Sequence, residues 1–160
     1  MKFLITLLCV FFLGLSSVSQ TYVYPNQFMY FGEMVCNVQG GHVISGSSNM
    51  WGDASLTAQN NKIFKGFSTS TFDVLYTLKD GKLYAGTSTF SFDLLFTVLN
   101  GKIYKGDSTM MMDCLYTYDI KSNRLYKGDS TFGLDAVLFF QGEMLNAEEL
   151  LAVLMTLEML

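Results

Sequence analysis

The chain has few of the residues on which most enzymes and metal sites depend. Its 160 residues include one His, three Cys and one Pro. A metal site of several His or Cys side chains is therefore excluded by count. With His42 as the single histidine, nothing selects one serine for a Ser-His-Asp arrangement. The sequence also lacks a G-x-x-x-x-G-K-[ST] phosphate loop, which argues against nucleotide-dependent chemistry.

Positive charge is also scarce. Ten Lys and Arg residues stand against fourteen Asp and Glu residues, for a formal net charge of −4. Binding to nucleic acid relies on neutralising phosphates, so an acidic chain of this kind is a poor candidate for it. After the first twenty residues, the apolar segments lie within repeats or at the C-terminus. The sequence therefore predicts neither a nucleic-acid partner nor a transmembrane segment.

The N-terminal segment has the features of a secretory signal peptide. Lys2 precedes an apolar run from Phe3 to Leu15, and small residues stand at Ser17 and Ser19. The run is shorter than the about 20 residues that a membrane-spanning helix needs. We assign residues 1–19 to the signal peptide, with cleavage near Ser19–Gln20, and expect a secreted, periplasmic or cell-surface protein.

Two cysteines, Cys36 and Cys114, remain after this cleavage. An exported protein could join them in a disulfide, because disulfides persist in oxidising compartments. Cys114 stands at a periodic apolar position, however, where a buried free thiol is equally consistent. The sequence leaves both alternatives open.

A unit of about twenty residues repeats along the middle of the chain. Each copy contains the pattern G-x-S-[TN]-x-x-x-D, and such periodicity is typical of repeat architectures. The repeats lie near 42–61, 62–81, 82–101, 102–123 and 124–142. The recurring glycines are Gly46, Gly66, Gly86, Gly106 and Gly128, and the recurring aspartates are Asp53, Asp73, Asp93, Asp113 and Asp135.

Each repeat is predicted to form a β-hairpin. Apolar and polar residues alternate from Phe72 to Lys79, and Asp80-Gly81 then gives a tight-turn signal. This turn places Lys79 opposite Lys82 and Leu78 opposite Leu83. The fourth repeat has two extra residues at the turn, which a hairpin tolerates better than a parallel β-helix does. Over this turn alone, the segment D-G-K-x-Y-x-G resembles the start of a MORN-type hairpin repeat.

The predicted register divides the side chains between two faces of the sheet. One face, the outer face, carries a mixed set of polar and apolar residues, including an aromatic stripe of Tyr84, Tyr104 and Tyr126, and is expected to be partly solvated. The main core face comprises Val74, Tyr76, Leu78, Leu83, Leu94, Phe96, Val98, Ile103, Cys114, Tyr116, Tyr118 and Leu125.

The predicted fold is mainly β, with one C-terminal α-helix. About ten short antiparallel strands in residues 20–145 form an up-and-down meander, which is expected to curl or close because open edges are liabilities. Residues 146–160 should form a helix of about four turns, started by Asn146 and Glu149 as a capping box. Its polar side is narrow, so it should plug or cover the sheet; dimerisation and membrane-surface docking are the alternatives.

The repeated polar and aromatic residues are the candidate site. Its members are Asp73, Asp93, Asp113, Asp135, Ser88, Ser108, Tyr84, Tyr104 and Tyr126. The aspartates could cap the Ser-Thr bends of their own repeats, supply oxygen ligands to Ca²⁺, or bind sugar hydroxyls. The tyrosines could pack across strands or form a stacking platform for a ligand. No cofactor is expected beyond the Ca²⁺ alternative.

Two functions follow from these patterns. The first is a secreted non-catalytic binding or structural module that presents its repeats to a glycan, an envelope component or a protein. The second is a glycosidase-like hydrolase with paired Asp residues, since aspartates one repeat apart would be roughly 9–10 Å apart. An active site needs two carboxylates with different surroundings, whereas each repeat offers the same one. This favours the binding module and leaves its partner and oligomeric state open.

Overall fold

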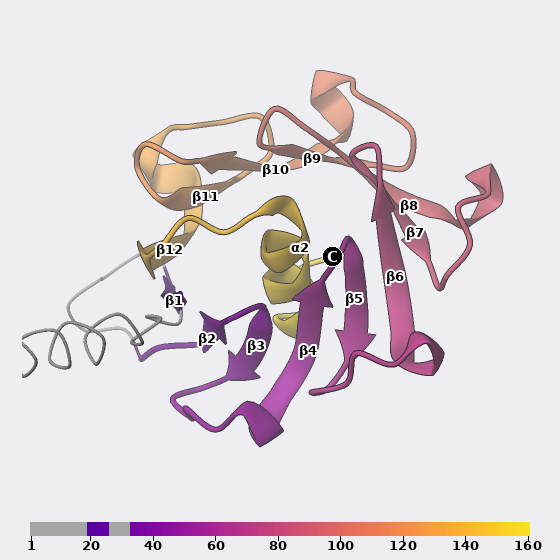
Figure 1. Ribbon diagram of the computed structural model, residues 1–160. Coiled ribbons are helices and arrows are strands. Elements are labelled where there is room, and N and C mark those ends of the chain that lie inside the picture. The colour runs from indigo at the N-terminus through magenta and orange to yellow at the C-terminus, as the bar shows by residue number, and fades with distance from the viewer. Residues whose placement is uncertain (1–18, 26–32) are drawn as a thin grey trace, which may run out of the picture.

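The computed structural model describes residues 19–25 and 33–160, so the predicted signal peptide lies outside it apart from Ser19. Twelve strands of the described chain close into one antiparallel barrel (Figure 1). The strands are β1 (Gln20–Pro25), β2 (Cys36–Gln39), β3 (His42–Ser45), β4 (Ala54–Gln59), β5 (Lys62–Lys65), β6 (Val74–Lys79), β7 (Lys82–Ala85), β8 (Leu94–Leu99), β9 (Lys102–Lys105), β10 (Cys114–Asp119), β11 (Arg124–Lys127) and β12 (Ala136–Gly142).

The strands follow one another around the barrel in chain order. Every strand pairs antiparallel with its neighbours in sequence, and β1 pairs with both β2 and β12. The barrel thus consists of six antiparallel pairs, of which the pair β12–β1 joins segments from opposite ends of the described chain. The predicted mainly-β meander and its closure are confirmed. The strands number twelve and not about ten, because the opening segment supplies β1 and β2.

The hairpin register agrees with the sequence prediction. Lys79 lies opposite Lys82 and Leu78 opposite Leu83 in the β6–β7 pair. Asp80 and Gly81 both have positive φ, at 51° and 73°, as the mirror-image tight turn between twisted strands requires. This agreement follows from the turn, whose two residues allow only one pairing of the flanking strands.

A β-bulge at the start of each long strand changes the predicted faces. Tyr76 lies opposite Ile63, but Val74 lies opposite Phe64, with a register shift between them. Residues opposite each other share a face, so Val74 joins Phe64 on the outer face. The prediction that Val74 belongs to the main core face is therefore wrong. The same shift places Leu94 opposite Tyr84 and Cys114 opposite Tyr104.

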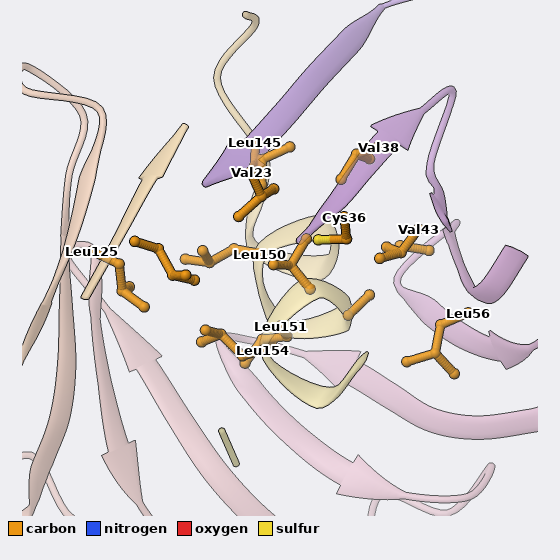
Figure 2. Packing of buried hydrophobic residues seen from close by; sticks show 14 of the residues in the cluster. Val23, Cys36, Val38, Val43, Leu56, Leu125, Leu145, Leu150, Leu151 and Leu154 are labelled. Carbon is orange, nitrogen blue, oxygen red and sulfur yellow. The ribbon is translucent and has the colours of Figure 1, made fainter. Parts of the chain in front are cut away.

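The core lies inside the barrel, around the helix α2 (Ala147–Thr156). Leu150, Leu151 and Leu154 of α2 pack among inward-facing residues such as Val23 and Leu125 (Figure 2). The helix therefore covers the sheet from within, as the narrow polar side predicted. Its capping box is present, but the helix is shorter than expected at ten residues.

Both cysteines of the described chain are free and buried. Cys36 faces the core, where burial disfavours the thiolate and raises its pKa to about 12. Cys114 lies beside Thr117, with a distance of 3.8 Å between Sγ and Oγ1. The free thiol, one of the two alternatives for Cys114, is the state present here. In residues 19–25 and 33–160, no helix has the length and apolarity needed to cross a membrane.

The meander sorts its connections between the two ends of the barrel. Antiparallel strands reverse direction at each connection, so the tight hairpin turns gather at one end and the longer connections at the other. Each of five longer connections ends in a 3₁₀ turn. These turns are η1 (Trp51–Asp53), η2 (Thr71–Asp73), η3 (Ser91–Asp93), η4 (Met111–Asp113) and η5 (Gly133–Asp135).

Candidate binding surface

The five longer connections form a set of surface loops with one shared backbone. Figure 1 shows their 3₁₀ turns at the periphery of the molecule, away from the central helix α2. Each loop starts at a glycine of positive φ, such as Gly66 at 61°, and ends at the repeated aspartate. The repeated G-x-S-[TN]-x-x-x-D pattern thus encodes a loop between hairpins, where the chain is free to present side chains.

In four of the five loops, the serine and the aspartate of the pattern are hydrogen-bonded to each other and stabilise the loop. In the fourth loop, Ser108 donates to Asp113 at 2.5 Å and accepts from the Met110 amide at 3.1 Å. The amide of Asp113 also donates to the carbonyl of Met110, at 3.0 Å. The aspartate thus binds the serine hydroxyl, while the serine holds the backbone of the bend.

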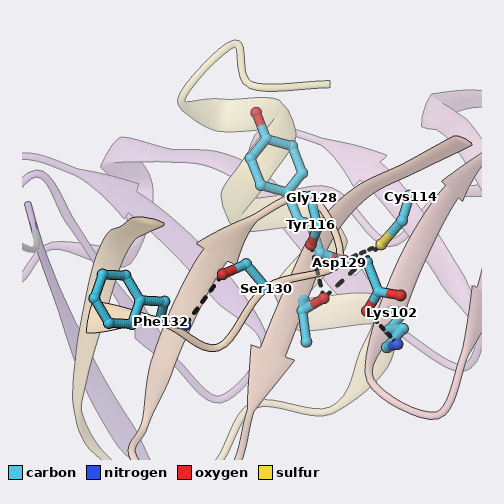
Figure 3. Close-up of polar contacts among 8 residues, drawn as sticks. Lys102, Cys114, Tyr116, Gly128, Asp129, Ser130 and Phe132 are labelled. Atoms are coloured by element: carbon cyan, nitrogen blue, oxygen red, sulfur yellow. Dashed lines mark hydrogen bonds and ion pairs between the residues drawn. The ribbon is translucent and has the colours of Figure 1, made fainter. Parts of the chain in front are cut away.

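The same contact recurs in other repeats. Ser48–Asp53, Ser68–Asp73 and Ser130–Asp135 are hydrogen-bonded at 2.6, 2.5 and 2.5 Å. Ser130 also accepts a hydrogen bond from the Phe132 amide at 3.1 Å, as Ser108 does from the Met110 amide (Figure 3). Between the described residues Ser88 and Asp93 no such bond is present, although Ser88 still accepts from the Phe90 amide at 3.2 Å.

We expect Ser108→Ala to lower the free energy of unfolding by about 1–2 kcal/mol, because it removes two hydrogen bonds at once. Ser88→Ala removes one bond and should cost about half as much. Urea unfolding of both variants against the unaltered chain measures the difference. Equal losses would show that the Ser108–Asp113 bond contributes nothing to stability.

Threonines at equivalent positions of the long strands, on the outer face, also hydrogen-bond to the loops. Thr97 donates to the carbonyl of Gly106 at 2.7 Å, and Thr117 donates to that of Gly128 at 2.8 Å. The neighbouring Tyr104 and Tyr126 are buried, whereas Tyr84 is half-buried. Tyr104 and Tyr126 therefore pack within the protein and do not form an open stacking platform. The expectation of a partly solvated outer face is wrong at these positions.

Two ion pairs join loops to a strand of the preceding repeat. Lys82 pairs with Asp107, and Lys102 pairs with Asp129 (Figure 3). In each case the hydrogen bond to the carboxylate raises the lysine pKa. The lysine opens a short strand, and the aspartate directly follows the repeated glycine of a loop further along the chain. This pair of positions is thus a recurring contact between neighbouring repeats.

The side chains that the loops expose are mainly apolar. Phe72 is 96% exposed, Phe92 is 82% exposed and Leu134 is 84% exposed. Soluble proteins rarely expose large apolar side chains in such numbers outside a contact surface. We call the following set the apolar rim: Met50, Trp51, Phe67, Phe72, Phe90, Phe92, Met110, Met111, Met112, Phe132 and Leu134.

The junction of the first and second repeats differs from the others in having three aromatic rings together. The rings of His42 and Phe67 are 4.6 Å apart between centroids, and Trp51 lies 5.6 Å from His42 and 6.2 Å from Phe67. Partial burial lowers the pKa of His42, because desolvation favours the neutral form of the ring. We call these three residues, with Asn49 and Gln39, the aromatic cluster.

The six antiparallel pairs agree with the sixfold β architecture named by a family model that matches the chain. The model of the 6-fold beta flower protein matches residues 18–154. The chain belongs to the 6-fold beta flower family. No curated protein matches it, and no solved structure does. The beta flower assignment makes the chain a β-repeat module and favours a non-catalytic role.

This beta flower brings the predicted aspartates and serines into its loops and the predicted tyrosines onto short strands, without joining them in one site. Asp73, Asp113 and Asp135 each contact the serine of their own repeat. Within residues 19–25 and 33–160, no three His, Cys, Asp or Glu side chains gather as metal ligands would. Sequence reasoning missed the apolar rim, because it placed Phe72 in the strand. The signal was an apolar residue recurring between the Ser and the Asp.

Proposed function

We propose that this beta flower is an exported, non-catalytic binding module that docks onto a lipid surface through its apolar rim. The observation that carries the proposal is the near-complete exposure of Phe72, Phe92 and Leu134 on three different loops. Moving such side chains from water into an apolar medium is favourable by about 1.5–3 kcal/mol each. Export rests on the signal-peptide features of residues 1–19.

The polar groups of the loops support an apolar partner. In four loops the repeated Asp carboxylate is hydrogen-bonded to its own Ser hydroxyl. Atoms engaged in this way are less available to a polar ligand, whereas the apolar side chains beside them have no such engagement. The Ser–Asp pairs therefore hold the loop while the apolar residues make the contact.

Variation among the loops favours a lipid surface over a single protein partner. The Gly, Ser and Asp of the pattern are identical in all five copies, but the exposed side chains range from Phe72 and Phe92 to Met112 and Leu134. In these four copies apolar character is kept while shape is not; in the first copy Gly52 takes this position, next to Trp51. A hydrocarbon medium accepts this variation, whereas a packed protein interface depends on shape complementarity.

The charge of the chain favours an uncharged lipid. The formal net charge is −4, and an anionic bilayer attracts basic clusters. Lys65, Lys105 and Lys127 are exposed at the ends of their strands, but the loops also carry the repeated aspartates. Binding should therefore come from apolar insertion, with little dependence on salt.

Co-sedimentation with neutral phosphatidylcholine vesicles tests the proposal. The unaltered chain should sediment with the vesicles, and Phe72→Ser/Phe92→Ser should bind at least about tenfold more weakly, because two apolar side chains no longer insert. Leu99→Ser/Ile120→Ser is the matched control. These two residues are also exposed but lie at the hairpin-turn end, and their loss should leave binding unchanged.

Two outcomes would contradict the proposal. One is an unaltered chain that stays in the supernatant with neutral vesicles. The other is concentration-dependent self-association, measured by sedimentation velocity, that Phe72→Ser/Phe92→Ser abolishes while vesicle binding persists. The second outcome would assign the apolar rim to contacts between copies of the chain.

The glycosidase-like alternative gains no support from the loops. Four of the five aspartates make the same contact with their own serine. A pair of catalytic carboxylates needs two environments that separate acid from base.

A further inference from the structure

The aromatic cluster departs from the repeat at several positions that meet in space. His42 replaces a Lys or Arg, Asn49 replaces a Thr, and Trp51 replaces a variable residue that is nowhere else aromatic. Phe67 occupies the position that is Asp107 or Asp129 in later repeats. The repeated residues suffice for the fold of the other hairpins. A set of exceptions gathered at one place therefore indicates a role that the fold does not require.

The contact between His42 and Phe67 stands where two later repeats have an ion pair. Lys82–Asp107 and Lys102–Asp129 join the equivalent positions. An aromatic contact can replace that link between repeats. Trp51 is not part of this contact between repeats, yet its ring lies beside the rings of both His42 and Phe67. Trp51 remains 45% exposed and Phe67 49% exposed. The cluster thus leaves substantial ring surface open to solvent.

Hydrogen bonds fix the tautomer of His42. Its Nδ1 lies 2.9 Å from the hydroxyl of Thr57, and that hydroxyl donates its single proton to the carbonyl of Gly66 at 2.6 Å. The hydroxyl must therefore accept from His42, so Nδ1 carries the ring proton. The Nε2 atom is then an unprotonated acceptor, and it has no hydrogen-bond partner among the described residues.

The indole nitrogen fixes the orientation of the amides in the same way. Trp51 Nε1 is only a donor, and it donates to Gln39 Oε1 at 3.1 Å. The amide nitrogen of Gln39 therefore points the other way, to Asn37 Oδ1 at 3.0 Å and Asn49 Oδ1 at 3.3 Å. With Oδ1 of Asn49 used as an acceptor, its amide nitrogen stays available as a donor. The indole is held in place before any ligand arrives.

We infer that the aromatic cluster is a binding site for one ring of a neutral saccharide. A pyranose has an apolar C–H face that suits the exposed rings of Trp51 and Phe67. Its edge carries hydroxyl groups that can both donate to His42 Nε2 and accept from the Asn49 amide. No charged side chain is needed for these contacts. The inference does not rest on lipid docking, because it concerns a different ligand and depends on polar atoms of His42 and Asn49, although Trp51 and Phe67 also belong to the apolar rim.

Fluorescence tests the site directly, since Trp51 is the only tryptophan of the chain. The full chain is titrated with neutral methyl pyranosides and their soluble oligosaccharides. We expect at least one sugar to shift the Trp51 emission saturably. Phe67→Ala should weaken the binding of that sugar by about tenfold, a loss similar to that caused by removing an aromatic ring stacked on a nucleobase. Leu99→Ala, which shortens an exposed apolar side chain at the hairpin-turn end, should leave the affinity unchanged.

A second variant separates the hydrogen bond from the stacking. His42→Phe keeps a ring but removes the Nε2 acceptor, and it should lower affinity while thermal unfolding shows that the chain still folds. A sugar that binds only as the headgroup of a glycolipid in vesicles, and not as a soluble glycoside, would identify a lipid-borne source. In that case Phe67→Ala and His42→Phe are titrated with the glycolipid vesicles in place of the soluble glycosides.

Three results would overturn the inference. The emission of Trp51 could stay constant with every sugar in both soluble and vesicle form. Binding could occur with full affinity in Phe67→Ala, which would place the sugar elsewhere. Tetramethylammonium could produce the saturable shift where sugars do not, which would make the cluster a cation site through its ring faces.

Discussion

Leu151→Ala is expected to lower the free energy of unfolding by about 2–5 kcal/mol, a large part of the stability of a domain of this size. Leu151 is fully buried on the helix α2, inside the barrel and within the core cluster. The substitution removes its contacts and leaves a cavity that strands paired around a closed barrel cannot collapse to fill. Urea unfolding followed by circular dichroism measures the loss.

Leu134→Ala is the matched control for this variant. It deletes the same atoms from a side chain that is 84% exposed in the apolar rim, so its effect on unfolding should stay within about 0.5 kcal/mol. If Leu151→Ala were as mild as Leu134→Ala, the helix would add nothing to barrel stability. The barrel would then have to be held by its strands alone.

Gly142→Ala is expected to weaken the closure of the barrel. Gly142 lies opposite Thr21 in the β1–β12 pair, and its φ of 129° is a conformation that side chains rarely adopt. An added Cβ would lie 2.3 Å from the carbonyl oxygen of Gln20 and 3.0 Å from Cα of Thr21. Backbone atoms cannot move aside cheaply, so the loss should reach about 3 kcal/mol or more. Backbone amides of β1 should be the first to lose their protection from hydrogen exchange.

Gly106→Ala separates the clash from the backbone conformation. Gly106 also has positive φ, at 61°, but an added Cβ there would meet nothing within 4 Å. Its cost should be about 1–2 kcal/mol, from the left-handed conformation alone. Equal losses of unfolding free energy in the two variants, with unchanged hydrogen exchange in β1, would show that the seam, the β1–β12 pair, tolerates a side chain at Gly142.

Local signals made most of the fold predictable. Asp80-Gly81 determined one hairpin and its register, and the twenty-residue period extended that result to the other repeats. The capping box of Asn146 and Glu149 located the start of α2. Closure could be expected from the need to protect edges, but the partner of β1 could not be read from any turn. That pairing joins residues about 120 positions apart, such as Thr21 and Gly142.

The faces and the candidate site were less predictable. Strict alternation assigned Val74 to the core, and the bulge before Tyr76 has no distinctive residue that would reveal it. Alternation also drew Phe72 into the strand, although a 3₁₀ turn leaves it exposed. The aromatic cluster depends on His42, Trp51 and Phe67 meeting across different segments. Only the positions of the hairpins in space bring these residues together.

The seam between β1 and β12 has a consequence for how the chain folds. Five hairpins can form from neighbouring residues, with little loop-closure entropy to overcome, whereas the sixth pair must wait until β12 reaches β1. Until then, both strands present unpaired backbone groups to other molecules. Closure of this pair should therefore be the late and slow step of refolding. The intermediate with an open seam is the species most prone to aggregate.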